Sequence, residues 1–318
     1  MPVPWINAKA PPGLFFLHPN CEGDTLDAAA RQQATLTREV SVNGFGFWSG
    51  RDIQVTFRPA AAGSGITFVR TDLPGRPRIP AVIQNRINGP RRTTLVANGA
   101  AVEMVEHVLA ALAGLQIDNC EIWVDRAEMP GCDGSSKAFV EALDEVGSVA
   151  QDRERQVVRV QQSIRVGDEF TWIQAEPVDQ DWLELEYQLI YPCPAIGAQT
   201  YRAQLTPETF RRDIAPARTF VLEHEAQQLQ QQGLGQRVSY RDVLVFDDQG
   251  PIDNSLRYAD ECARHKMLDM VGDFSLSGAD LIGRFTASRS GHRLNSQMVF
   301  ALLQQVVQPL SKTIRIPA

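Results

Sequence analysis

The feature that most constrains the fold of this sequence is an order of elements that occurs twice. Hydrophobic periodicity predicts the first series of strands, helix, strand, polar turn and helix at residues 35–60, 101–114, 120–127, 128–135 and 136–147. It predicts a second series of the same kind at residues 155–192, 259–274, 281–289, 290–292 and 294–307. We interpret the two series as a structural duplication in an α+β chain. Because few residues are identical between the halves, two unrelated α+β domains remain the alternative.

The repeated order also suggests domain boundaries. Residues 1–33, with a PPG turn and a polar tail, are predicted to be an N-terminal extension that is partly disordered. Domain I is expected at 34–150 and domain II at 151–318, since residues 148–156 are polar and lack periodicity. Within domain II, a region at about residues 194–250 is interpreted as an insert between the strands and the helix that follows them. It includes a predicted helix with Leu222, Ala226 and Leu229 on one face, for which a plain surface helix is the simplest interpretation.

Composition excludes several classes of function. The 318 residues include 31 basic and 38 acidic side chains, a net charge of −7 that argues against binding nucleic acid over a broad basic face. Binding of an acidic partner at a small local patch of basic residues is not excluded by this charge. The five cysteines are scattered and form no CxxC pair, which favours a reducing compartment. The start of the chain resembles no signal peptide and no stretch is apolar over bilayer length, so we expect a cytoplasmic protein.

One candidate metal site follows from the spacing of histidines and acids. His265 and Asp269 are four residues apart on a predicted helix and therefore share a face. His107 lies on the corresponding helix of the first half, directly after Glu106. If the halves pack about a pseudo-twofold axis, these side chains meet. Two histidines and one carboxylate with an open position are typical of catalytic zinc, and Glu106 would then accept a proton from water. Chance spacing of packed or solvated residues is the alternative.

A second set of candidates lies at the last predicted turn. His292 could serve as a general acid with its charge held by Asp273, or simply be a polar residue at a helix start. Arg289 and Arg293 form a small basic patch suited to phosphate. Lys266, beside the predicted metal ligands, is otherwise interpreted as an exposed cation.

Four separated motifs make the pattern more specific. They are VEHVLAALAGLQIDNCEIWVDRAEMPGCDGSS, APARTF, RHKMLDMVGD and TASRSGHRLN. From about Leu36 to about Val307 the chain resembles the UDP-3-O-acyl-N-acetylglucosamine deacetylase (LpxC) family of lipid A biosynthesis. The resemblance implies two similar α+β domains with helix layers face to face between two sheets. It also implies a zinc-dependent hydrolase that removes the N-acetyl group of the UDP-linked sugar and releases acetate.

The resemblance implies a role for each motif residue. His107, His265 and Asp269 would bind one zinc ion per chain, and ferrous iron would suit the same ligands. Glu106 would be the general base that deprotonates the attacking water. His292 would be the cation that stabilises the developing charge and protonates the leaving amine.

Further roles follow from the same resemblance. Asp273 would orient the catalytic histidine, and Thr219 would donate a hydrogen bond to the oxyanion. Phe220 would lie against the sugar. Lys266 corresponds to a lysine beside the site, and Arg289 stands where the family usually has a lysine near the diphosphate.

The sequence departs from the family pattern at positions that concern substrate recognition. Trp48 replaces a histidine in GFGFWSG, Cys193 replaces another in CPAI, and Thr171 lies where a lysine is expected. The resemblance also implies that the insert at about residues 194–250 forms the passage for the acyl chain, and residues 236–238 stand roughly where the family has a glycine-rich segment of this passage. A zinc deacetylase of a different acetylated nucleotide sugar or glycolipid is therefore an alternative, as is a non-catalytic binding protein. We expect a monomer that binds a UDP-linked acylated amino sugar and touches the membrane surface transiently through this lipid substrate.

Overall fold

The structure is a computed structural model that describes residues 30–307 of the chain. Most of the extension predicted for residues 1–33 lies outside the described residues. Its last residues, however, belong to the fold, because strand β1 (Gln32–Leu36) pairs antiparallel with β10 (Ser148–Glu154). The polar stretch without periodicity at the predicted domain boundary is therefore largely a strand. Its polar side chains fit a two-stranded ribbon whose residues are mostly exposed.

Two sheets have the same connectivity. The first has the strand order β2 (Val40–Phe45), β3 (Asp52–Pro59), β9 (Cys120–Val124), β4 (Ile66–Arg70), β5 (Arg78–Pro80). The second has the order β12 (Ile164–Gly167), β13 (Trp172–Glu176), β18 (Asp280–Ser288), β14 (Leu183–Ile190), β15 (Ala198–Gln204), with β11 (Val157–Arg159) also paired to β18. In each sheet the middle strand is antiparallel to the neighbour before it and parallel to the one after it. This shared topology confirms the predicted duplication.

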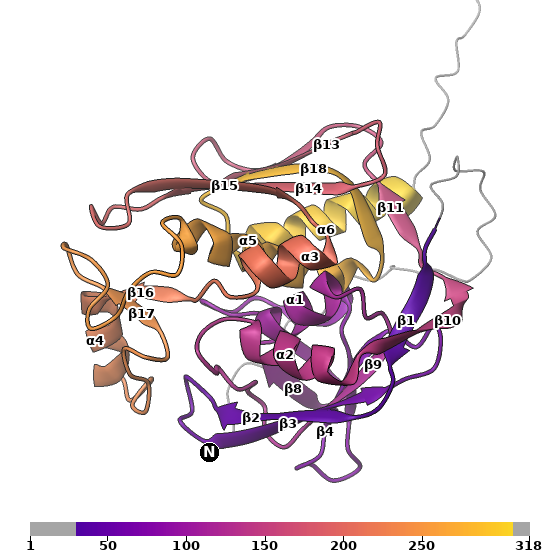
Figure 1. Ribbon diagram of the computed structural model, residues 1–318, viewed down its shortest axis with the longest axis horizontal. Helices are drawn as coiled ribbons and strands as arrows, with labels where there is room; N and C mark the ends of the chain where they lie inside the picture. The colour runs from indigo at the N-terminus through magenta and orange to yellow at the C-terminus, as the bar shows by residue number, and fades with distance from the viewer. Residues whose placement is uncertain (1–29, 308–318) are drawn as a thin grey trace, which may run out of the picture.

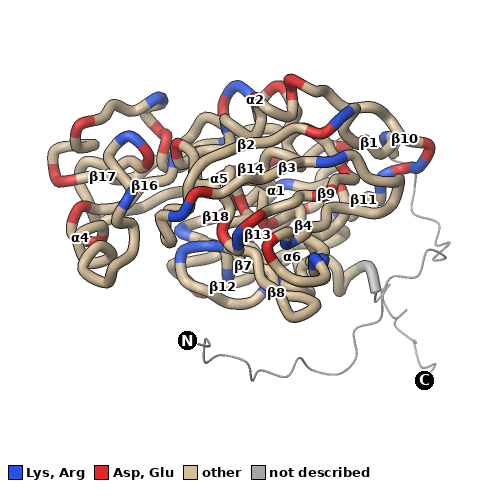
Figure 2. Tube along the Cα trace, turned by 90° about the horizontal axis from the view of Figure 1, so that it is seen from below, with Lys and Arg blue, Asp and Glu red and all other residues tan. Residues whose placement is uncertain are grey.

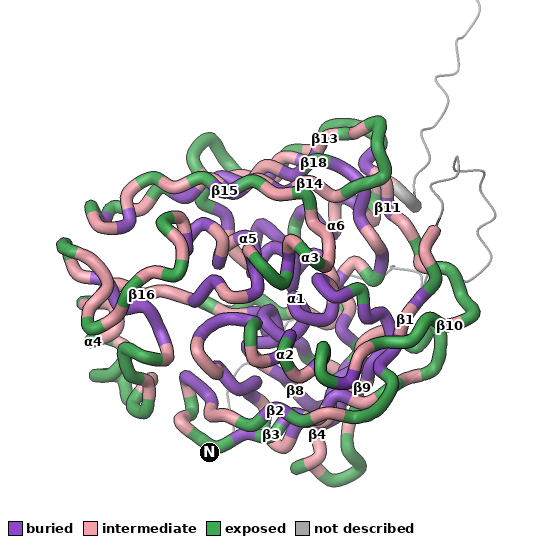
Figure 3. The backbone as a smooth tube through the Cα atoms, viewed as in Figure 1, coloured by how far each residue is buried: buried purple, intermediate pink, exposed green. Residues whose placement is uncertain are grey.

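Helices fill the space between the two sheets (Figure 1). In the first half α1 (Glu106–Gly114) precedes and α2 (Lys137–Val146) follows the middle strand; in the second half α5 (Glu261–Phe274) and α6 (His292–Val307) do the same. Helices α1 and α5 pack against each other at the centre of the molecule. Buried residues concentrate in this central layer and on the inner faces of the sheets (Figure 3). The predicted fold of two similar domains with facing helix layers is confirmed.

The predicted helix at 101–114 begins too early. Residues 100–103 form β8 (Ala100–Glu103), which pairs with β7 (Thr94–Ala97) in a small sheet with β6 (Arg86–Ile87). Burial alternates along β8, so these residues fit the period of a strand. Met104 then adopts a left-handed φ of 58° and separates the strand from the helix.

The insert of the second half lies at one end of the molecule. Strands β16 (Phe220–Leu222) and β17 (Leu244–Phe246) pair in parallel around α4 (Glu223–Gln231), at the left of Figure 1. A short α3 (Pro207–Thr209) and the π-helix η2 (Phe210–Ile214) lead into it. The remaining short elements are the 3₁₀ turns η1 (Ile83–Asn85) and η3 (Ser275–Ser277).

A close approach of helices sets the geometry of the centre. A Cβ atom on Gly272 of α5 would lie 2.1 Å from the main-chain oxygen of Glu106, in the first turn of α1. Only a residue without a side chain allows this contact. Gly272 therefore allows the two helices that carry the candidate metal ligands to pack closely against each other.

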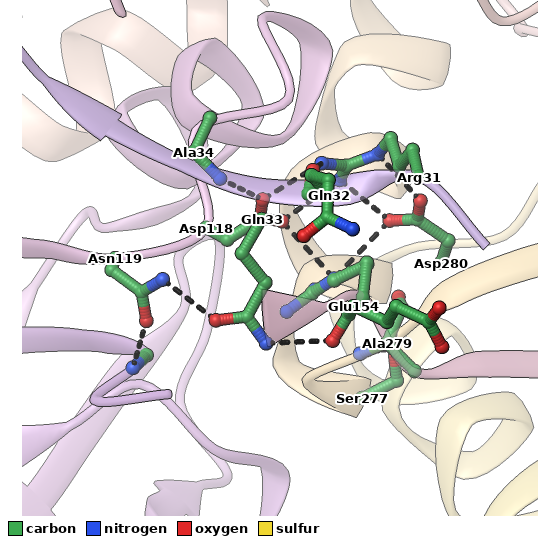
Figure 4. Close-up of polar contacts among 12 residues, drawn as sticks. Arg31, Gln32, Gln33, Ala34, Asp118, Asn119, Glu154, Ser277, Ala279 and Asp280 are labelled. Atoms are coloured by element: carbon green, nitrogen blue, oxygen red, sulfur yellow. Dashed lines mark hydrogen bonds and ion pairs between the residues drawn. The ribbon is translucent and has the colours of Figure 1, made fainter. Parts of the chain in front are cut away.

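A cluster of ion pairs joins the two halves at the opposite end from the insert (Figure 4). The guanidinium of Arg31 donates to Asp118 of the first half at 2.7 and 2.8 Å and to Asp280, the first residue of β18, at 2.8 and 3.0 Å. Arg155 lies 3.1 Å from Asp118 and 3.3 Å from Asp280. Two arginines thus neutralise two aspartates where both halves meet the β1–β10 ribbon.

Charged residues elsewhere show no separation by sign on the face seen from below. Acidic and basic positions are interspersed along the chain there (Figure 2). Among the helices of residues 30–307, none combines the length and apolar character that crossing a membrane would need.

Candidate active site

Three potential metal ligands converge where α1 meets α5. The Nε2 atom of His107 lies 3.6 Å from Oδ1 of Asp269, and Nε2 of His265 lies 3.5 Å from the same oxygen. All three donor atoms are within 4.8 Å of one another, and the residues are buried. The imidazole rings are nearly perpendicular, with centroids 5.0 Å apart. The structure thus brings together the three residues that spacing and resemblance suggested.

Neighbouring groups prepare two of these side chains to bind a cation. His265 donates from Nδ1 to the carbonyl oxygen of Ala217 at 3.1 Å, which leaves the Nε2 lone pair facing the other ligands. Burial lowers the pKa of His265 to about 3, so its imidazole is neutral. Burial alone would raise the pKa of Asp269, but Lys266 and His265 hold it well below its usual value. Lys266 donates to the other Asp269 oxygen at 2.9 Å.

The donor set fits a zinc ion. Ligands at bonds of about 2.1 Å in a tetrahedron lie about 3.4 Å apart, close to the two separations from the shared carboxylate oxygen. Two imidazoles and one carboxylate also leave a coordination position for water or substrate, which structural sites do not. The same ligands accept ferrous iron, so the donors identify a site for a divalent metal rather than one element.

An acid–base pair lies beside the metal ligands. Nε2 of His292, the first residue of α6, is 3.9 Å from Oε1 of Glu106. Burial raises the pKa of Glu106, opposed by the positive charge of His292. Burial would lower the pKa of His292, yet the hydrogen-bonded carboxylate of Asp273, 2.8 Å from Nδ1, raises it to about 9. A cation and a buried carboxylate thus face each other, the arrangement needed to move a proton in each direction.

Two residues that sequence reasoning missed hold this pair in place. Thr93 is fully buried; its main-chain N–H donates to Glu106 at 2.9 Å and its hydroxyl donates to Asp273 at 2.6 Å. Asn295 donates from Nδ2 to Asp273 at 2.8 Å. Asn295 is the last residue of the motif TASRSGHRLN, which could have pointed to it, whereas Thr93 belongs to no such motif. Thr93 directly precedes strand β7 of the small sheet and reaches the site only through tertiary packing.

A cavity of about 870 Å³ opens next to these groups, and the proposed substrate residues line it. Thr219, Phe220 and Arg289 all contribute to its wall. The Phe220 ring lies edge-on to Tyr191, at 5.4 Å between centroids, and Nζ of Lys266 is 5.8 Å from its centroid. Tyr191, which the sequence analysis did not select, also lines the cavity.

One part of the cavity wall is apolar. It comes from the insert and comprises Val221, Ala226, Leu229, Leu234, Val238, Val243 and Val245. Helix α4 has no buried residue, because its apolar face turns to this cavity rather than to a core. The helix expected to pack on the core as a plain surface helix thus lines a cavity with its apolar face.

The positions that depart from the family pattern differ in their relation to the cavity. Trp48, Thr171 and Val238 line it, and the guanidinium of Arg92 lies 4.6 Å from the centroid of the Trp48 ring. Cys193 is buried and donates to the carbonyl of Asp247 at 3.4 Å, outside the cavity lining. Three of the four departures thus alter a surface that a bound substrate can touch.

The comparisons with known proteins agree with this geometry. The profile of one family, described as UDP-3-O-acyl N-acetylglycosamine deacetylase, matches residues 33–304. A UDP-3-O-acyl-N-acetylglucosamine deacetylase of Thermosynechococcus vestitus is 39% identical over 278 residues, 87% of this chain and 96% of that protein. A protein of the same name from Chlamydia caviae is 38% identical over 281 residues, 88% of this chain and 99% of that protein. One from Brucella melitensis is 37% identical over 273 residues, covering 85% and 95%.

Proposed function

The chain belongs to the UDP-3-O-acyl N-acetylglycosamine deacetylase family, and from this premise we propose how its site performs the reaction. The protein is a hydrolase that removes the N-acetyl group from UDP-3-O-acyl-N-acetylglucosamine and releases acetate, a step of lipid A biosynthesis. The observation that carries the residue assignment is the convergence of His107, His265 and Asp269 from two halves of the chain, 3.5 to 3.6 Å apart through one carboxylate oxygen.

The three ligands would hold one zinc ion, which when bound would polarise the amide carbonyl and acidify water. Glu106 accepts a proton from the water that attacks the carbonyl carbon. A carbon–oxygen bond forms, and the Thr219 hydroxyl donates a hydrogen bond to the oxyanion. The carbon–nitrogen bond then breaks as His292 gives its proton to the leaving amine. Asp273 keeps His292 charged and oriented until that step, and acetate and the free amino sugar leave.

The cavity supports the placement of the substrate. Phe220 lies against the sugar, Arg289 and Arg293 meet the diphosphate, and the acyl chain enters the apolar groove of the insert. Lys266 keeps Asp269 ionised through its hydrogen bond of 2.9 Å. The protein acts as a monomer and touches the membrane surface only while it takes up its lipid substrate. The free state of the cysteines within residues 30–307 supports a reducing, cytoplasmic location.

A different acetylated nucleotide sugar or glycolipid is a second candidate substrate. The cavity positions of Trp48, Thr171 and Val238 favour it, because they differ from the family pattern where substrate binds. Rates with UDP-3-O-acyl-N-acetylglucosamine, UDP-N-acetylglucosamine and other N-acetyl sugars distinguish the candidates. We expect kcat/KM to be highest with the acylated sugar. Equal rates without the acyl chain would contradict an acyl groove.

The test of the mechanism is a pair of alanine variants. Glu106→Ala and His292→Ala should each lower kcat by at least about a hundredfold, because each removes one proton-transfer group. The zinc content of both should stay at one per chain, since neither side chain is a ligand. Acetate release and metal content are measured on the same samples. Near-normal turnover in both variants would refute the roles, and metal binding without hydrolysis of any acetamide by the unmodified protein would favour a non-catalytic binding protein.

A further inference from the structure

A segment without regular structure, residues 215–219, contributes two groups to the metal centre and its cavity. The carbonyl oxygen of Ala217 accepts the Nδ1 proton of His265 at 3.1 Å and so fixes which imidazole nitrogen faces the metal. Two residues later, Thr219 lines the cavity. The residue between them, Arg218, is not in the cavity wall and is only 5% exposed.

Arg218 is instead bound to a buried carboxylate. Its Nε donates to Glu261 Oε1 at 2.8 Å and one Nη group donates to Oε2 at 3.1 Å, while Glu261 is 0% exposed. The remaining guanidinium contacts are Asn254 at 3.0 Å and the carbonyl of Ser255 at 2.7 Å. Glu261 opens α5, the helix that carries His265 and Asp269. The ion pair therefore connects the segment to the metal-binding helix.

The carboxylate also holds the main chain. Glu261 accepts from the N–H of Arg218 at 3.1 Å and from the N–H of Arg257 at 2.6 Å. These bonds fix the peptide between Ala217 and Arg218, whose carbonyl is the one that contacts His265. A rotation of this peptide would move the carbonyl oxygen away from the imidazole.

The first half of the chain holds the other side of the segment. The N–H of Thr219 donates to the carbonyl of Gly134 at 2.8 Å, and the N–H of Ser136 donates to the carbonyl of Ala215 at 3.0 Å. Ser136 also donates its hydroxyl to the carbonyl of His107 at 2.8 Å. The segment is therefore fixed between α1 and α5. The ion pair of Arg218 with Glu261 holds it to α5, in the second half of the chain.

We propose that Arg218 and Glu261 are positioning residues that set the tautomer and orientation of His265 and the place of Thr219. Neither residue touches the metal ligands' donor atoms. The inference deepens the proposed function and rests on it for the roles of His265 and Thr219. A buried pair whose only task was stability would leave metal affinity and kcat unchanged in any variant that still folds.

The test uses the full chain with both charges removed, Arg218→Met with Glu261→Leu, so that no charge is left buried without a partner. We expect the zinc dissociation constant to rise about ten- to a hundredfold, as is usual when a group orienting a ligand is lost. We expect kcat to fall at least about tenfold and KM to stay within about twofold. In the metal-free protein, the Nδ1–H signal of His265 should shift or broaden in nitrogen NMR spectra.

If the double variant does not fold, the single variants Arg218→Lys and Glu261→Gln are measured in its place. Each keeps part of the contact, so its zinc affinity should lie between those of the wild type and the double variant. The matched control is Arg211→Met with Asp144→Asn, an exposed pair at 2.8 and 2.9 Å, which should leave the zinc dissociation constant, kcat, KM and the Nδ1–H signal unchanged. A folded variant with wild-type zinc affinity and kcat would overturn the proposal. Failure of the wild type itself to bind zinc or to deacetylate would instead count against the proposed function.

Discussion

Burial and single contacts together decide the charge of each group in the site. Asp269 stays ionised because Lys266 donates to it, and His265 stays neutral because it is buried. His292 differs from His265 because a carboxylate lies 2.8 Å from its ring nitrogen. Two histidines in one site thus differ in charge, and each charge state suits its proposed role: His265 is a neutral ligand and His292 a cationic proton donor.

The raised pKa of His292 predicts an alkaline limit to activity. Burial opposes the charge, but Asp273 raises the pKa to about 9, so His292 loses its proton as the pH rises through that value. We expect kcat to fall above about pH 9 in the wild type, measured from pH 6 to 10. Asp273→Asn removes the carboxylate that stabilises the cation, so the fall should move toward the ordinary value of about 6.5. A fall at the same pH in both proteins would show that another group limits the rate.

At the scale of elements, the site depends on how closely α1 and α5 approach. Gly272 permits the contact, and the ligands are spread over both helices, so neither helix holds a site alone. Spacing on α5 could be read from the sequence, since four residues make one helical turn. The approach of α1 could only be supposed, because it depends on the packing of two sheets and not on any local pattern.

Gly272→Ala tests this dependence. The added Cβ would lie 2.1 Å from the Glu106 carbonyl, so the helices must separate. We expect a loss of about 1–3 kcal/mol in the free energy of unfolding and weaker zinc binding. Urea unfolding and zinc titration measure the two effects.

Gly114→Ala is the matched comparison for this variant. Its Cβ would meet the ring of Phe210 at 2.2 Å, at the far end of α1. It should cost similar stability and leave zinc affinity unchanged. Equal zinc affinity in both variants would contradict the importance of the helix contact.

At the scale of the whole molecule, the two halves are joined at the centre by helices and at one end by the cluster around Arg31. The cluster lies far from the insert, and its residues are buried to different degrees: Asp118 has 3% of its side chain exposed and Arg31 has 25%. The pKa of Arg31 is raised despite its burial, because both aspartates stabilise its charge. Its position at the start of the described chain means that the N-terminal strand helps to hold the halves together.

Arg31→Ala should therefore lower the free energy of unfolding by about 1–3 kcal/mol, the usual effect of losing hydrogen bonds to buried charges. The rate of deacetylation at low temperature should not change, because the cluster lies at the opposite end from the cavity. The control is Arg38→Ala, whose pair with Glu145 is more than 60% exposed on both sides and should contribute less than about 1 kcal/mol. Equal stability of the two variants in urea would show that the cluster is not a structural link.

The sequence by itself determined the duplicated order of elements, the motifs and the one-turn spacing of His265 and Asp269, because periodicity and helical geometry are local properties of the chain. One error was local too: the first residues of the helix predicted at 101–114 form strand β8, since pairing with the preceding strand β7 overrides a weak local preference. The β1–β10 ribbon had no local signal, because it pairs residues more than a hundred positions apart. The tertiary structure alone decided that Thr93 links Glu106 to Asp273 and that Arg218 meets Glu261. These contacts join residues from 13 to 180 positions apart, and no local pattern encodes such a distance.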